Sequence, residues 1–220
     1  CSFSILANSS ESSKIFKDEN YGVTADITIL TDGLVKIISK KNVTYGAAAY
    51  NYGRNLPKEL SWFKDKYISS GLNSKPKTFQ LKSFWEKHKD EATFILFEMK
   101  RDLSKPDEKY MFGFTSMTIP KTGKTLATAP YIAPMQGSPR PVVGSMQGYQ
   151  LPAGGTYRVI YLLPKTITSV LINLDGRSNE EAIILKPPAA KKDKIEVLKD
   201  YKSYLESKIS NIDNMIRNIN

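Results

Sequence analysis

The sequence has little of the chemistry on which most active sites depend. It contains one cysteine, Cys1, and one histidine, His88, among 220 residues. An internal disulfide needs a second thiol, and a protein zinc site needs three or four cysteine, histidine or carboxylate ligands. We therefore expect no internal disulfide, no metal site and no bound cofactor.

The motifs that resemble catalytic ones are incomplete. Residues 144–148 read Gly-Ser-Met-Gln-Gly, which lacks the Gly-x-Ser-x-Gly spacing of a serine nucleophile. Residues 120–125 look like the end of a phosphate-binding loop, but Thr118 stands where the first glycine of that loop is needed. His88 lies between Lys87 and Lys89, which predicts an exposed histidine on a helix. The sequence therefore predicts a protein that is not an enzyme.

Long apolar runs are also missing. No stretch of 18 or more residues is continuously apolar, whereas a helix that crosses a bilayer needs about 20 such residues. We therefore expect any membrane attachment to come from a lipid on Cys1 rather than from a spanning helix.

Basic residues exceed acidic ones, but they are dispersed. The chain has 32 Lys and Arg against 22 Asp and Glu, a formal net charge of +10. The nearest approaches to clusters are the pairs at 40–41 and 191–192, and neither matches a nucleic-acid-binding signature. The charge favours encounters with acidic surfaces, such as an acidic host glycan, and predicts no specific nucleic-acid site.

The first residues indicate where the protein is held. A Cys1-Ser2 start, a tether rich in Ser, Asn and Lys, and a body rich in Lys, Ile and Asn resemble the outer-surface lipoproteins of spirochaetes, particularly those of Borrelia. The resemblance implies an acylated Cys1, attachment to the outer membrane and display at the cell surface as an antigen. The alternative is that Cys1 is a cloning remnant or a domain boundary chosen by chance.

The chain divides into three parts by composition. Residues 1–20 form a polar, aperiodic stretch that predicts a flexible tether, residues 21–190 predict a mainly β body, and residues 191–220 predict an amphipathic helix. The body is long enough to bury a substantial core.

Three groups of strands are expected in the body. Residues 23–30 and 34–39 flank an Asp-Gly turn, which predicts a hairpin. Residues 92–100 and 110–119 predict a second hairpin, and the long apolar run at 92–97 indicates burial on both faces. Residues 156–163, 167–174 and 181–185 predict a third antiparallel set.

Two short helices are expected between these strands, at residues 56–68 and 83–91. The predicted fold class is therefore α+β and mainly antiparallel β, as a sandwich or curved sheet, with one or two short helices and a long C-terminal helix.

Two regions of the body are candidate ligand sites. Tyr45, Tyr50, Tyr52 and Arg54 lie among small residues, where they would form a stacking platform for sugar rings with a clamp for an anion. The alternative, which we favour, is a strand whose small residues let another element pack closely. Residues 120–155 are rich in Pro and Gly and include Arg140, which predicts an ordered, loop-rich excursion with one or two short strands.

The final segment carries one continuous apolar stripe. Asp193 and Glu196 form a capping box, and apolar residues then recur at steps of three and four, with Lys202 in the same row. We expect a helix of about seven turns whose stripe packs on the β body of a monomer; pairing with another chain as a coiled coil is the alternative. The candidate interface residues are Leu198, Leu205, Ile209, Ile212 and Ile216.

Two functions follow from these features. The first is a non-enzymatic surface lipoprotein that binds a host protein or acidic glycan in adhesion or immune evasion. The second is a structural or assembly lipoprotein facing the periplasm, which docks a partner through its C-terminal helix.

The lipoprotein hypothesis is tested by labelling. Cells that produce the protein from its own gene should incorporate radiolabelled palmitate into it, and Cys1→Ser should abolish the label because no other thiol is present. A chain that stays unlabelled, or a Cys1→Ser variant that keeps its label, would contradict acylation at this position.

Overall fold

The computed structural model describes residues 13–40, 43–47, 56–67, 77–104, 110–112, 115–119, 124–126, 130–135, 149–167, 169–174, 177–184 and 191–217. Within them the chain forms antiparallel sheets, a few short helices and one long C-terminal helix. The predicted α+β fold class is confirmed.

Seven strands form the main antiparallel sheet. Their order across it is β1-β2-β5-β11-β9-β3-β4. In chain order their bounds are β1 Ser13–Asp18, β2 Val23–Ile29, β3 Thr44–Ala47, β4 Thr78–Gln80, β5 Ala92–Arg101, β9 Tyr131–Pro134 and β11 Thr156–Pro164. β5 and β11 are the longest strands and pair along most of their length, from Thr156 opposite Lys100 to Pro164 opposite Ala92.

A second layer contains a four-stranded antiparallel sheet, in the order β13-β12-β7-β8, and a two-stranded ribbon of β10 and β6. Their bounds are β6 Tyr110–Phe112, β7 Thr115–Ile119, β8 Lys124–Leu126, β10 Tyr149–Leu151, β12 Ser169–Leu174 and β13 Arg177–Ile184. The predicted pairing of residues 167–174 with 181–185 is confirmed in β12 and β13. β11 does not join them, because it lies in the main sheet.

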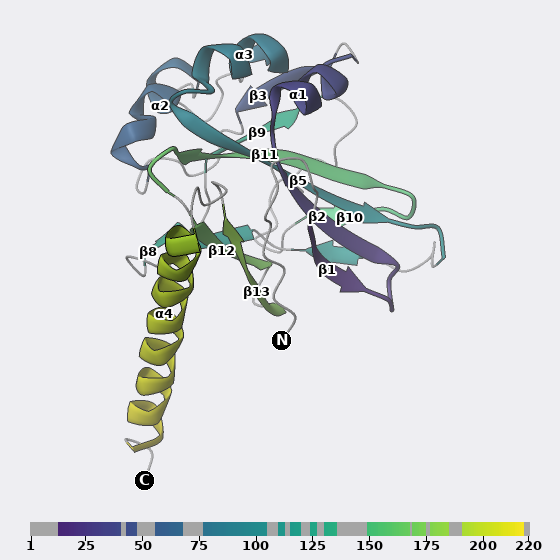
Figure 1. Cartoon of the computed structure of the whole chain (residues 1–220). Coiled ribbons are helices and arrows are strands. Elements are labelled where there is room, and N and C mark those ends of the chain that lie inside the picture. Colours follow the sequence, from purple (N-terminus) through teal and green to yellow (C-terminus); the bar gives the residue numbers. More distant parts are fainter. Residues whose placement is uncertain are drawn as a thin grey trace.

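The short helices cover the opposite face of the main sheet. α1 (Asp32–Ile38), the 3-10 turn η1 (Lys58–Leu60), α2 (Ser61–Tyr67) and α3 (Leu81–His88) come from the first half of the chain. Figure 1 shows α1, α2 and α3 together on one side of the main sheet, with β8, β12 and β13 on the other. The helices predicted at 56–68 and 83–91 are confirmed, the first with shorter bounds and the second displaced toward the N-terminus.

The central strands supply the core on both faces. Along β5, Ile95 and Phe97 pack in one cluster with residues of β2, β6 and β10, whereas Phe94 and Leu96 pack in another with the helices. The alternation follows from the period of two in a strand. The predicted burial of this run on both faces is confirmed, and the fold is a helix layer, a sheet and a second β layer.

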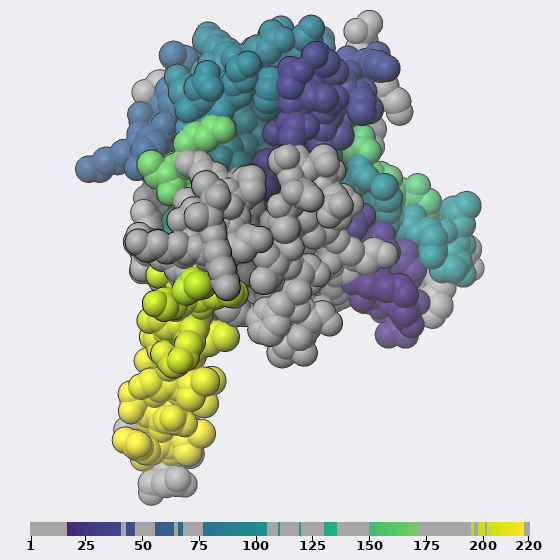
Figure 2. Space-filling view, in the orientation of Figure 1, coloured from purple at the N-terminus to yellow at the C-terminus, as the bar shows by residue number. Residues whose placement is uncertain are grey.

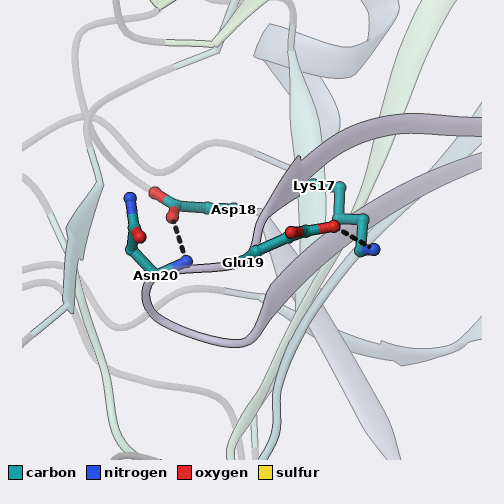
Figure 3. A network of polar contacts seen from close by, with 4 residues as sticks. All are labelled: Lys17, Asp18, Glu19 and Asn20. Carbon is teal, nitrogen blue, oxygen red and sulfur yellow. Dashed lines mark hydrogen bonds and ion pairs between the residues drawn. The ribbon is translucent and has the colours of Figure 1, made fainter.

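Part of the predicted tether forms a strand. Residues 13–18 lie in the stretch that we predicted to be a flexible tether, yet they form β1 and pair with β2, from Ser13 opposite Ile27 to Asp18 opposite Val23. Figure 3 shows the turn between the strands, where the Asn20 amide donates to Asp18 Oδ1 (3.1 Å) and Lys17 pairs with Glu19 (2.6 Å). The edge of a sheet provides partners for a polar segment that has no periodicity of its own, because the bonds are made by the backbone.

The first predicted hairpin is also wrong in its second half. β2 is present, but residues 32–38 form α1 instead of a returning strand. Thr31 caps the helix by accepting a hydrogen bond from the Leu34 amide (3.4 Å), and Asp32 pairs with Lys36 one turn later (2.6 Å). A Thr-Asp-Gly sequence is compatible with the start of a helix as well as with a turn. Here the Thr31 cap stabilises the helix.

The second predicted hairpin does not form. β5 pairs with β2 and β11, whereas β6 pairs with β10 and β7 pairs with β12 and β8. The strands predicted at 92–100 and 110–119 lie at the expected positions, as β5 and as β6 with β7, but their partners differ. An apolar strand pattern does not specify which neighbouring strand it meets.

Residues 120–155 contain three short strands among the described residues, rather than one or two. They are β8, β9 and β10, and each belongs to a different sheet. The excursion therefore links the two β layers.

The C-terminal helix α4 (Lys191–Arg217) has 27 residues, as the periodicity predicts. It projects away from both β layers (Figure 1).

Two substitutions on one strand test the layered core. Phe94→Ala and Phe97→Ala remove rings that are 2% and 0% exposed on opposite faces of β5, and each should lower the free energy of unfolding by about 3–5 kcal/mol. Urea denaturation measures both. Ile37→Ala, at a side chain that is 64% exposed, is the control and should change stability by less than about 0.5 kcal/mol. A small effect at either phenylalanine would contradict burial on that face.

Candidate functional site

One residue of the predicted aromatic platform, Tyr45, is buried rather than exposed. Tyr45 lies on β3 and is 3% exposed, packed in the cluster beneath the helices. The alternative interpretation is supported, because a Cβ on the neighbouring Gly46 would come within 2.7 Å of the Met135 sulfur. Tyr50, Tyr52, Arg54, Arg140 and Cys1 lie outside the described residues.

His88 is buried, so the prediction of an exposed histidine is wrong. It is 1% exposed, at the end of α3, and its ring stacks on Trp62 at 3.9 Å between centroids. Its Nδ1 lies 2.7 Å from Glu91 Oε2, and its Nε2 lies 2.8 Å from the Tyr67 hydroxyl. Flanking lysines suggested exposure, but on a helix the neighbours in sequence point to other sides.

The Glu91 carboxylate and the Tyr67 hydroxyl together satisfy the hydrogen-bonding groups of a neutral His88 imidazole. With the proton on Nδ1, the imidazole donates to Glu91 and accepts at Nε2 from the Tyr67 hydroxyl. Burial lowers the pKa of His88, against the opposing effect of the Glu91 hydrogen bond and charge. Burial, with the Glu91 charge, raises the pKa of Tyr67. Both ring nitrogens of the buried imidazole are hydrogen-bonded and its face is covered by Trp62, so the geometry favours a structural role.

A hollow of about 230 Å³ lies where α3 meets β5. The hollow is lined by Trp85 and Thr93 and by three charged residues, Lys89, Asp90 and Lys165. The Lys89 ammonium lies 5.1 Å from the centroid of the Trp85 ring. Two cations beside one carboxylate would attract a small acidic or zwitterionic molecule.

Among the described residues, no group of three or more His, Cys, Asp or Glu side chains is placed to hold a metal ion. Nor does any helix in that part of the chain have both the length and the apolar character needed to cross a membrane.

Among the described residues, most of the exposed large apolar side chains belong to α4. The prediction that its stripe packs on the β body is contradicted, because the large apolar side chains along it are exposed. Figure 2 shows the helix in yellow, extending away from the rest of the molecule on this face. The exposed residues are Ile195 (44%), Leu198 (50%), Leu205 (36%), Ile209 (58%), Ile212 (55%), Met215 (65%) and Ile216 (53%).

The polar residues of α4 leave this stripe uninterrupted except at one place. Lys202 lies in the same row and pairs with Glu206 (3.5 Å) on the adjacent turn. The side of α4 opposite the stripe carries polar residues such as Ser207 and Asn214. An amphipathic helix of this kind is built to bury one face against another element.

Comparisons with known proteins add no family. No protein-family model matches the chain, and no significant match was found among curated proteins or solved structures.

The His88 cluster makes a pH prediction. Because the pKa of His88 is lower in the folded chain, protons bind preferentially to the unfolded chain below the ordinary value of about 6.5. The free energy of unfolding should therefore be constant above that value and decrease as the pH falls below it. Urea midpoints measured between pH 7.5 and pH 5.5 check this.

His88→Gln is the control, since it removes the only histidine in the chain. The variant should be less stable at neutral pH but should lose the decrease in this range. An equal slope in both proteins would show that another group is responsible.

Proposed function

We propose that the chain is a non-enzymatic interaction protein, held at the outer membrane by a lipid on Cys1, that docks a partner through the apolar face of α4. The observation that supports the docking role is the exposure of seven large apolar side chains along one helix. The anchor is supported by the sequence, through its resemblance to spirochaete lipoproteins.

Physical chemistry favours docking over a free helix. In proteins, most of the stability of a helix comes from packing its apolar face against another element. Each large apolar side chain that moves from water to an interior contributes about 1.5–3 kcal/mol. An exposed apolar stripe bordered by polar residues is therefore typical of an interaction surface.

This proposal corresponds to the second of the two functions suggested by the sequence. Binding of a host ligand to the tyrosine platform is less well supported, because Tyr45, one of the four platform residues, is buried. Catalysis through His88 is disfavoured, since the imidazole is enclosed by Trp62, Tyr67 and Glu91.

Site-specific photocrosslinking in intact cells tests the proposal. A photoreactive phenylalanine analogue at Leu205 or Ile209 should give a discrete crosslinked product, because these side chains would lie against the partner. The same analogue at Ser207 or Asn214 is the matched control, since these residues are on the outer side of the helix. Electrophoresis detects the products.

Face dependence is the decisive result. Products from the apolar face alone support docking. No product at Leu205 and Ile209, or equal yields from both faces, would contradict it. Proteolysis of intact cells, in parallel, reports whether the body faces outward or toward the periplasm.

A further inference from the structure

We propose that the partner of α4 is the α4 of a second copy of this chain, packed beside it in a parallel, two-stranded coiled coil. The inference rests on the proposed docking function and names the partner for the same face. It is carried by the type of residue at each position of the heptad repeat and by the charges that border the seam.

The apolar stripe follows a seven-residue repeat. Ile195, Ile209 and Ile216 occupy position a, where Lys202 is the exception, and Leu198, Leu205 and Ile212 occupy position d. Two helices that carry a seven-residue repeat supercoil around each other, which keeps the apolar seam of each one facing the other. Six of these residues are at least one-third exposed, so the seam is free of the β body.

The choice of side chains at these positions bears on the number of helices in a parallel coiled coil. In that arrangement β-branched Ile at a with Leu at d favours two strands, and three of the four a positions are Ile while two of the three d positions are Leu. A single Lys at an a position fixes register and oligomer state at a cost in stability. Lys202 is the single lysine at an a position, and its ammonium pairs with Glu206 on the same helix.

Charges beside the seam are partly complementary in this arrangement. In a parallel pair, position g faces position e of the following heptad on the other helix. Lys208 at g would face Asp213 at e of the second copy, an attractive pair. Lys194 at g would face Lys199 at e, a repulsive pair at the first turns of the helix.

The repulsive pair distinguishes parallel from antiparallel packing. In an antiparallel pair, e positions face each other, so Lys199 would lie opposite Asp213 or Glu206. Lys199→Glu should therefore strengthen a parallel pair, by removing two repulsions, and weaken an antiparallel one, by creating like-charged contacts. One substitution changes the affinity in opposite directions for the two arrangements.

The test uses the full chain with Cys1→Ser, so that no lipid drives association, in sedimentation equilibrium at micromolar concentrations. We expect a dimer. Ile209→Asp should weaken dimerisation by about a hundredfold or more, because it places two charges in the seam. Lys199→Glu should tighten it about three- to tenfold at low salt, and less at high salt. Ser207→Asp, on the outer face, should leave it unchanged.

Each other result overturns the proposal. A monomer, a trimer or a larger assembly excludes a two-stranded pair. A dimer that survives Ile209→Asp uses a different surface, and a dimer weakened by Lys199→Glu is not parallel. Near-ultraviolet circular dichroism, unchanged in every variant, ensures that loss of dimer is not loss of the β body.

Failure of this inference is distinguishable from failure of the proposed function. If the chain is monomeric but Leu205 and Ile209 still crosslink in cells to a product whose mass is not twice that of the chain, docking stands and the second copy is excluded. If those positions give no product, the docking function itself fails.

Discussion

The burial of both faces of the β5–β11 pair is the constraint on which the rest of the body depends. Alternate residues of each strand point to opposite sides, and in β5 both sets are apolar, as with Phe94 and Phe97. A sheet that is apolar on both sides needs a cover on each. The short helices cover one face, and β6, β10 and β12 cover the other, which explains why small elements far apart in sequence gather around two long strands.

Strong local patterns predicted the elements, and contacts between distant segments decided the rest. β5, β11 and α4 each have enough periodic residues to be recognised alone. The segment Leu-Val-Lys-Ile-Ile at 34–38 fits a strand and a short helix equally well, and the Thr31 cap with helix packing selects the helix. β1 was missed because its stability comes from an existing sheet edge. Strand partners were missed because an apolar pattern does not specify which neighbour it meets.

The candidate site shows the same limit. The seam of α4 was predicted residue by residue, since heptad spacing is a local property. Its exposure was not, because whether a stripe packs on its own body depends on geometry that the spacing does not contain. His88 was misplaced for the opposite reason. Its charged neighbours are local, but Trp62 and Tyr67 reach it from another helix and change its environment completely.

β1 changes the mechanics of the proposed anchor. The sheet begins at Ser13, so a lipid on Cys1 is joined to it by a dozen residues, which span at most about 40 Å when fully extended. A load on the lipid would reach an edge strand that is held to β2 by backbone hydrogen bonds. Peeling β1 from the sheet would release about 20 Å of additional chain. The hairpin would thus act as a reserve of length, which yields under tension before the central strands are strained.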